Sequence, residues 1–121
     1  MRKNNFYRFI LPVYMLIFSK FIFPSSFNAL ALWPFIVLKD KNLKNDIILI
    51  NHEKIHLRQQ VEMLWLGFFV FYMIEFFIKL VIYKKPKIAY HNLCFEREAY
   101  INEQNLTYLR DRKLWYFLKY L

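Results

Sequence analysis

The long apolar run Met63–Tyr83 (MLWLGFFVFYMIEFFIKLVIY) constrains the fold of this chain more than any other stretch. It is long enough for the roughly 20 residues that a transmembrane helix needs. Glu75 and Lys79 interrupt it at i, i+4 spacing, so their charges can pair on one helix face. Charged residues inside such a run generally face protein or water rather than lipid. The run therefore predicts a long membrane-associated helix or a helical hairpin.

The composition favours a single helix-rich domain. The chain has 121 residues, 58% of them hydrophobic, and contains one Gly and four Pro. So few breaking residues argue against a many-turned β architecture. The net charge is +9, and the basic clusters flank apolar runs, which favours membrane headgroups over nucleic acid. We expect a mainly α fold, a small membrane-associated helical bundle at a cell membrane, with lipid partners and no nucleic-acid partner.

A second apolar run, Phe9–Phe23, follows a short basic start. No small-residue cleavage site of a secretory signal follows it, and Arg8 and Lys20 could snorkel to the two membrane interfaces. We interpret residues 1–26 as an N-terminal membrane anchor and residues 27–121 as the helical domain. The alternative is a core helix of a very apolar soluble fold.

Residues 28–38 predict a small β element. Phe35–Leu38 (FIVL) is rich in strand-forming residues, and the preceding Pro34 restricts it to an edge strand or a short strand. A polar turn, Lys39–Asn45, follows. We expect a short β-hairpin or a single edge strand here.

The letters HEKIH, from His52 to His56, match the pattern H-E-x-x-H. Asp46 is a good N-cap for a helix that carries this pattern. On a helix, positions i and i+4 lie on one face, so His52 and His56 can direct imidazole nitrogens at one zinc ion. Glu53 stands beside them, where a carboxylate can accept a proton from water. The pattern predicts a catalytic zinc site, and its alternative is a chance match on a polar helix face.

A catalytic zinc site uses three protein ligands, so a third is required elsewhere in the chain. Glu96 and Glu98 stand close together in the sequence FEREAY, within a helix predicted over about Ala89–Tyr108. Either carboxylate could point back at the metal.

Other polar residues could assist such a site. Gln59 follows His56 by about one turn and could support a metal ligand, although a solvated or capping role is the alternative. Hydrogen bonds to a reaction intermediate could come from His91, Tyr90 or Tyr100. For His91 the alternative is an ordinary polar residue at a helix start.

These residues carry a resemblance to a known family. H-E-x-x-H followed by E-x-x-A at Glu96–Ala99 resembles the gluzincin branch of the zincin metallopeptidases, over about Asp46–Asn105. The layout also resembles short bacterial membrane proteins of that branch. The family pattern continues with Asp where this chain has Tyr100, which has no carboxylate to orient a His ligand.

The resemblance implies the metal ligands His52, His56 and Glu96, with Glu98 as the fallback ligand and Glu53 as the general base. It implies a membrane-associated zinc metallopeptidase that cleaves peptide or protein substrates, in a bacterial inner membrane. Zinc peptidases commonly hold substrate as an added strand at a sheet edge. The alternative is a non-enzymatic small integral membrane protein, an adaptor or assembly factor, with a structural or vestigial metal site.

The third ligand and a single spanning helix conflict geometrically. A continuous helix from Ile50 to Tyr83 would be about 50 Å long and would carry Tyr83 about 40 Å from His56. The segment that leads on to Phe95 reaches about 40 Å only when fully extended. A reversal at Gly67, the one glycine of the chain, would return Glu96 to the histidines. We predict a helical hairpin, and the alternative is a spanning helix whose zinc ligand comes from elsewhere.

Overall fold

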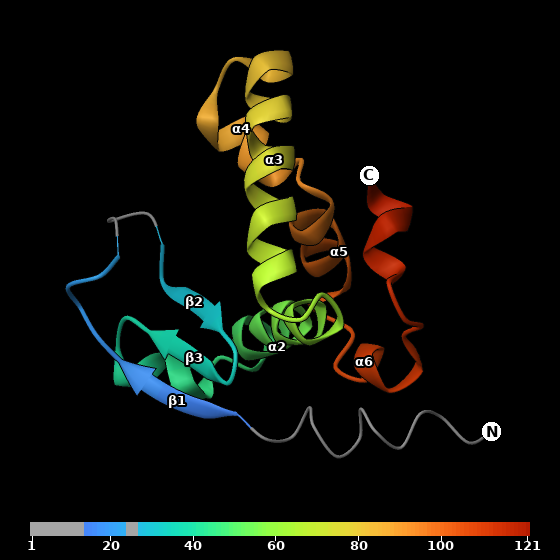
Figure 1. Ribbon diagram of the computed structural model, residues 1–121. Coiled ribbons are helices and arrows are strands. Elements are labelled where there is room, and N and C mark those ends of the chain that lie inside the picture. The colour runs from blue at the N-terminus through green and yellow to red at the C-terminus, as the bar shows by residue number, and fades with distance from the viewer. Residues whose placement is uncertain (1–13, 24–26) are drawn as a thin grey trace.

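The computed structural model describes residues 14–23 and 27–121, in which a small sheet and several helices surround the helix that carries the H-E-x-x-H pattern (Figure 1). The predicted mainly α fold with a short β element is confirmed. In chain order the elements are β1 Met15–Phe18, β2 Ala29–Leu32, β3 Phe35–Leu38, the 3-10 helix η1 Lys41–Asn45, α2 Ile47–Glu62, α3 Leu66–Tyr83, α4 Pro86–His91, α5 Cys94–Asn102, α6 Tyr108–Asp111 and the 3-10 helix η2 Tyr116–Tyr120.

The sheet has the strand order β1-β3-β2, with β1 parallel and β2 antiparallel to β3. Of the two alternatives for residues 28–38, the short β-hairpin is confirmed, because β2 and β3 pair antiparallel across the turn at Trp33 and Pro34, and β3 lies in the middle of the sheet and not at its edge. Pro34 does not prevent this position, since it lies in the turn before the strand, after a cis Trp33–Pro34 peptide bond, and bonds to β1 through its carbonyl, which accepts the N–H of Met15. The edge strand that faces α2 is β2.

The structure differs from the helix expected over Phe9–Phe23. Within the described part of that run, Met15–Phe18 forms β1 and pairs with β3. A short apolar run suits a buried helix and a strand equally well by its periodicity, and here a neighbouring strand satisfies its backbone. Residues 1–13 and 24–26, which hold the rest of the expected anchor, lie outside the described residues.

Helix α2 begins where its cap predicts and is surrounded by protein along most of its length. The N–H of Leu49 donates to Oδ1 of Asp46 at 3.0 Å, which is the predicted N-cap. Many polar side chains of α2 are buried, and they are tolerated because they form hydrogen bonds. Asn51, for example, donates to the carbonyls of Glu103 and Asn105. These bonds attach the helix to the segment that follows α5.

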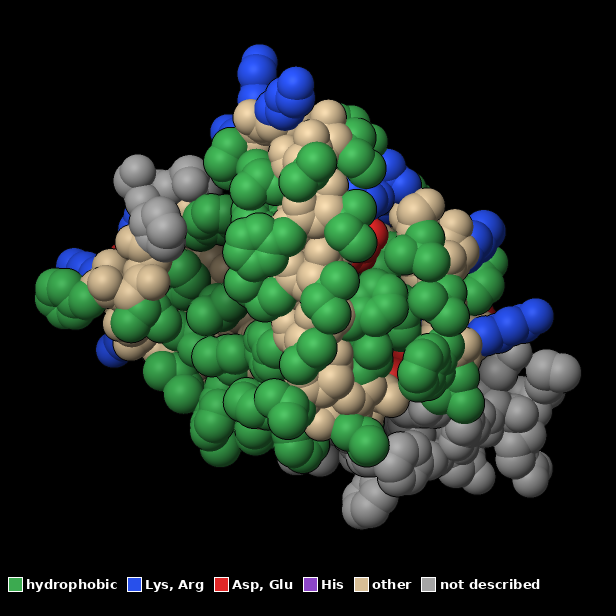
Figure 2. All heavy atoms as spheres, turned by 45° about the horizontal axis from the view of Figure 1, so that its top comes forward, with side chains coloured by type: hydrophobic (Ala, Val, Ile, Leu, Met, Phe, Trp, Pro, Cys, Tyr) green, Lys and Arg blue, Asp and Glu red, His purple; other side chains and the backbone are tan. Residues whose placement is uncertain are grey.

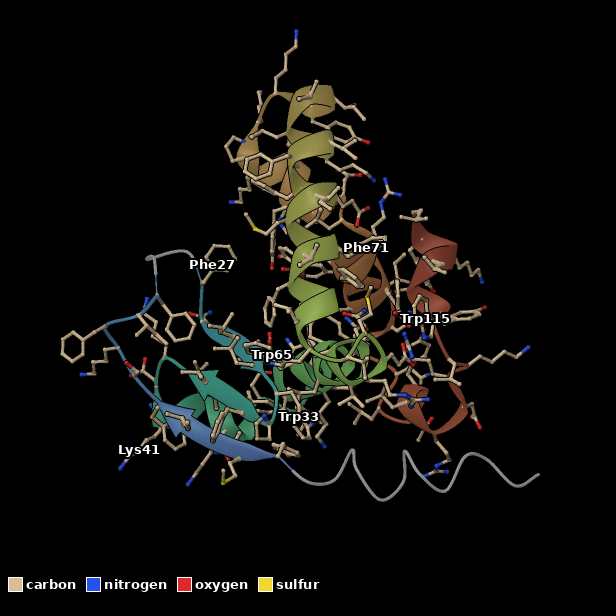
Figure 3. The ribbon with its side chains drawn as sticks, in the orientation of Figure 1. Phe27, Trp33, Lys41, Trp65, Phe71 and Trp115 are labelled. Atoms are coloured by element: carbon tan, nitrogen blue, oxygen red, sulfur yellow. The ribbon has the colours of Figure 1, made fainter. Side chains whose placement is uncertain are left out.

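The chain breaks close to Gly67, as predicted, but the glycine does not form the turn. Leu64 and Trp65 lie between α2 and α3 with φ of 56° and 63°, in the left-handed region. Figure 3 labels Trp65 at this turn. Gly67 already belongs to α3, and a Cβ added there would meet the Cβ of Met63 at an ordinary 3.6 Å. The turn therefore depends on its own backbone hydrogen bonds, such as that from the N–H of Trp65 to the carbonyl of Gln60.

The return path also differs from the predicted hairpin over residues 63–83. Helix α3 stands at a steep angle to α2, and the chain returns through α4, which packs along α3, and α5, which packs against α2 (Figure 1). The predicted ion pair between Glu75 and Lys79 is present, with Nζ and Oε2 3.5 Å apart. Glu75 also accepts the N–H of Cys94 at about 3 Å and so attaches the start of α5 to α3.

The helix predicted over residues 89–108 is divided after His91. Asn92 and Leu93 separate α4 from α5. The Asn92 amide donates to the carbonyl of Ile88, and its oxygen accepts from Arg97. Asparagine competes with helical hydrogen bonding through such local contacts. The break lets α5 turn towards α2.

Apolar side chains pack in two clusters. The first joins the sheet to α2 and contains Ala31, Ile36, Leu38, Ile50 and Leu57. The second joins α3, α5 and η2 and contains Phe68, Cys94, Phe95 and Phe117. Figure 3 shows Phe71 of α3 and Trp115 on the side of this second cluster. The candidate site lies where α2 meets α5, between the two clusters.

Candidate metal centre

Three buried side chains from α2 and α5 meet at one point: His52, His56 and Glu96. The Nε2 atoms of His52 and His56 are 3.2 Å apart. Oε1 of Glu96 lies 3.2 Å from Nε2 of His56 and 3.5 Å from Nε2 of His52. Ligands bound tetrahedrally to zinc at about 2.0–2.1 Å are about 3.3 Å from one another. The three atoms therefore already have the spacing of a metal's ligands, and the cluster could hold a metal ion.

The hydrogen bonds behind the histidines fix their tautomers. Nδ1 of His52 lies 2.8 Å from Oε1 of Glu103, and Nδ1 of His56 lies 2.8 Å from Oε1 of Gln59. Because both partners are acceptors, the proton of each neutral imidazole lies on Nδ1, which leaves a lone pair on each Nε2 directed towards Glu96 when the histidines are not protonated. Two lone pairs and a carboxylate oxygen thus converge, which is the electronic arrangement that a cation requires.

The pKa values point to the same conclusion. Burial alone would lower the pKa of His56, but the charge and the hydrogen bond of Glu96 outweigh it and raise this pKa to about 9. Burial would raise the pKa of Glu96, but the two histidines hold it well below its usual range. The site therefore attracts a positive charge, which a proton or a metal ion can supply.

Glu98, the alternative ligand, lies on another face of α5 because residues two apart on a helix point in different directions. Its carboxylate accepts hydrogen bonds from Tyr108 at 2.5 Å, from Nη2 of Arg112 at 3.0 Å and from Gln59 at 2.9 Å. It is fully buried in this ion pair. The structure does not bring Glu98 to the cluster of His52, His56 and Glu96, and Gln59 links it to His56 by hydrogen bonds to both.

Glu103 is a site residue that the sequence reasoning missed. It supplies the carboxylate behind His52, whereas Tyr100 packs its ring against that imidazole with centroids 4.5 Å apart. Glu96, Tyr100 and Glu103 recur at i, i+4 and i+7, so they share one helical face. This spacing is the sequence signal that would have identified Glu103.

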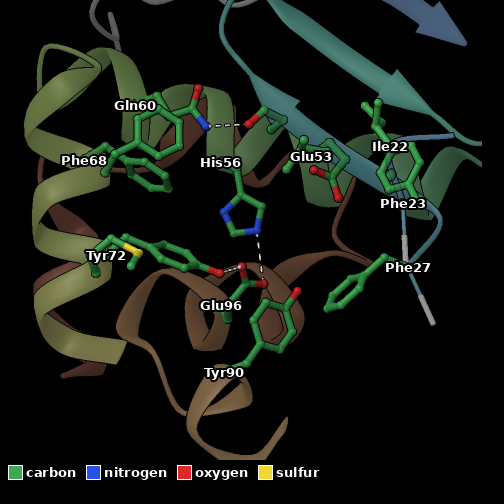
Figure 4. Close-up of a pocket in the computed structure, with 15 residues that line it drawn as sticks. Ile22, Phe23, Phe27, Glu53, His56, Gln60, Phe68, Tyr72, Tyr90 and Glu96 are labelled. Atoms are coloured by element: carbon green, nitrogen blue, oxygen red, sulfur yellow. Dashed lines mark hydrogen bonds and ion pairs between the residues drawn. The ribbon is translucent and has the colours of Figure 1, made fainter. Parts of the chain in front are cut away.

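A pocket of about 410 Å³ opens beside the metal cluster (Figure 4). The carboxylate of Glu53 lines this pocket together with His56 and Glu96. In the described part of the chain, the Glu53 carboxylate forms no hydrogen bond to another side chain. Burial raises the pKa of Glu53, although the histidines partly oppose this. Most of the remaining wall is apolar, including Ile22, Phe27, Leu30, Phe68, Phe69 and Met73. The pocket therefore places the Glu53 carboxylate, whose pKa is raised, next to a mostly apolar wall.

Two tyrosines stand close to Glu96. The Tyr72 hydroxyl donates to Oε2 of Glu96 at 3.1 Å and so orients that ligand. Tyr90 lines the pocket and turns its hydroxyl towards its interior next to Glu96 (Figure 4). His91 is exposed, and its ring contacts Tyr90 and Tyr100 instead of the pocket. Of the side chains considered for an intermediate, the structure brings Tyr90 into the pocket.

The edge strand β2 borders the same pocket. The Gln60 side chain donates to the carbonyl of Ala31 at 2.8 Å and accepts the N–H of Trp33 at 2.6 Å. These backbone groups therefore point away from β3. Ala29, two residues before Ala31, directs its backbone groups the same way and lines the pocket. A short stretch of strand edge is thus open beside Glu53.

Comparisons of the chain with protein-family models, with curated proteins and with solved structures gave no match. The functional conclusion accordingly rests on the geometry of the site.

Proposed function

We propose that this protein is a membrane-associated zinc peptidase whose metal is held by His52, His56 and Glu96. The observation that carries the proposal is the set of ligand atoms 3.2–3.5 Å apart beside the carboxylate of Glu53 in a pocket. Two imidazoles and a carboxylate suit zinc. Structural zinc sites are closed by four protein ligands, whereas catalytic sites have three. The three ligands beside a pocket favour an enzyme over a protein with a structural metal.

The chain's own residues supply the acid–base chemistry of peptide hydrolysis. When bound, zinc lowers the pKa of a coordinated water to about 7 and polarises a carbonyl group. Glu53 accepts the proton of the attacking water and passes it to the leaving amine, and its raised pKa suits both steps. Tyr90 donates a hydrogen bond to the carbonyl oxygen as negative charge develops there. Gln59 and Glu103 hold the two imidazoles in the ligating tautomer.

Two features support a peptide as the substrate. The open edge of β2 at Ala29 offers backbone hydrogen bonds to an extended chain. The apolar wall that includes Phe27, Leu30 and Phe69 suits an apolar side chain next to the cleaved bond.

Metal analysis combined with a quenched fluorescent peptide library tests the proposal. Purified wild-type protein should contain about one zinc per chain. His52→Ala should lose the metal, Glu53→Gln should keep the metal but lose cleavage, and Lys54→Ala on the same helix should behave as wild type. Wild-type protein without zinc, or cleavage retained by Glu53→Gln, would overturn it.

A further inference from the structure

Six exposed apolar side chains of α3 form a stripe along the helix. Their positions follow the spacing i, i+3, i+4, i+7, i+8 and i+11, which is one face of a helix, and all six are exposed: Val70, Met73, Ile74, Phe77, Ile78 and Val81. Figure 2 shows apolar side chains gathered over this face of the molecule. The opposite side of α3 carries the buried residues Phe68 and Glu75. We call the six exposed residues the α3 stripe.

The packing of α3 argues against a helix that crosses a bilayer. It is the one helix of residues 14–23 and 27–121 that is long and apolar enough to do so. Its inner face, however, holds the pair of Glu75 and Lys79, and Lys79 donates to the carbonyl of Asn92 at 2.8 Å. A crossing helix would bring α4 and α5, with the exposed His91, into the hydrocarbon, which is costly. The stripe is the face of α3 that is free to meet lipid, which is the arrangement of an interfacial helix.

The charge beside the stripe identifies the lipid. Lys84, Lys85 and Lys87 are exposed where α3 ends and α4 begins, and the chain as a whole carries a net charge of +9. Basic side chains at the rim of an apolar face attract anionic headgroups. A second copy of this chain would bring the same positive charge to the contact, so the observations favour anionic lipid as the occupant.

The pocket opens beside this face. Met73 belongs to the stripe and also lines the pocket. Across the pocket, Ile22, Phe27 and Leu30 are exposed apolar residues of its wall. The apolar surface therefore continues from α3 over the mouth of the pocket to β2.

We propose that the α3 stripe binds the protein to one leaflet of an anionic bilayer, with the mouth of the pocket at the lipid surface. The substrate would then be an apolar peptide segment at the membrane interface. The inference about the substrate rests on the proposed peptidase function, whereas the lipid contact does not.

Flotation of the full-length protein with vesicles tests the contact. We expect binding to phosphatidylcholine vesicles that contain phosphatidylglycerol, and weaker binding to phosphatidylcholine alone. A variant with Ile74→Asp and Ile78→Asp should bind at least about ten-fold more weakly. The control carries Ile47→Asp and Ile101→Asp, at isoleucines that are equally exposed but lie outside the stripe. Circular dichroism confirms that both variants fold. Equal loss in both variants, or no vesicle binding by wild-type protein, would overturn the inference.

A labelling experiment separates a one-sided contact from a crossing helix. Lys85→Cys and Lys113→Cys are made separately in a Cys94→Ala background, bound to sealed vesicles and treated with an impermeant maleimide. Labelling of both positions supports the proposal, whereas protection of position 85 that detergent abolishes would overturn it. Zinc content, measured on the same samples, tests the peptidase independently. Normal zinc without vesicle binding would remove the inference, together with the membrane association, and leave the proposed zinc site and its peptidase chemistry standing.

Discussion

The amide of Gln59 joins His56 to the buried ion pair of Glu98, and its removal should weaken metal binding. The side chain accepts from Nδ1 of His56 at 2.8 Å and donates to Glu98 at 2.9 Å and to the carbonyl of Phe95 at 3.2 Å. Gln59→Met keeps the approximate volume and removes all of these bonds. Loss of a hydrogen bond behind a metal-binding histidine typically costs 10–100-fold in affinity, or about 1.4–2.7 kcal/mol.

Gln60→Met is the matched control for this prediction. Gln60 is equally buried, and its amide forms hydrogen bonds to the backbone of Ala31 and Trp33 and not to His52, His56 or Glu96. Both variants should lose stability, because each leaves buried polar groups unpaired at about 1–3 kcal/mol apiece. Only Gln59→Met should lose zinc affinity, measured by competition with a chromophoric chelator. Equal affinity losses in the two variants, or none in Gln59→Met, would refute the role given to Gln59.

Three further predictions follow from the charges. Because the pKa of His56 is raised to about 9 without metal, zinc must displace a proton, so its affinity should rise about ten-fold per pH unit towards pH 9. A zinc affinity that no longer rises above pH 6.5 in a chelator titration would contradict this. Burial would raise the pKa of Glu98, but the hydrogen bond and charge of Arg112 outweigh it and lower this pKa. The ion pair of Glu98 with Arg112 therefore stabilises the fold above the ordinary glutamate pKa, and this contribution is lost as the pH falls through the lowered pKa. Arg112→Met should lower the free energy of unfolding, measured with urea at neutral pH, by about 3–5 kcal/mol, because it leaves the Glu98 charge buried without a partner. A decrease below about 1 kcal/mol would show that the ion pair is not isolated from water. Glu75→Gln should lower stability by about 1 kcal/mol through the weakened bond to the N–H of Cys94, with unchanged zinc content, and altered zinc content would contradict the separation of the two sites.

Local signals in the sequence predict the helix that carries the motif. Asp46 caps α2, the i, i+4 spacing aligns the histidines, and the need for a third ligand leads to the segment that contains Glu96. The reach of the chain between Tyr83 and Phe95 then requires a break in the long apolar run, and the structure has one at Leu64 and Trp65.

The parts that were missed depend on contacts distant in sequence. Met15–Phe18 becomes a strand because β3 lies beside it, which its own apolar pattern does not reveal. The choice between Glu96 and Glu98 depends on the rotation of α5, and the partner that removes Glu98 from the site, Arg112, lies beyond that helix. Glu103 follows from helical spacing once the position of Glu96 is known.

The most direct test of the account is X-ray absorption at the zinc edge of the purified protein. We predict a zinc ion bound by two imidazole nitrogens and by oxygen, with no sulfur, in wild-type protein and in Glu98→Gln. Glu96→Gln should lose zinc or change its coordination. A spectrum with a sulfur ligand, or one unchanged by Glu96→Gln, would contradict the central claim that His52, His56 and Glu96 form the metal site.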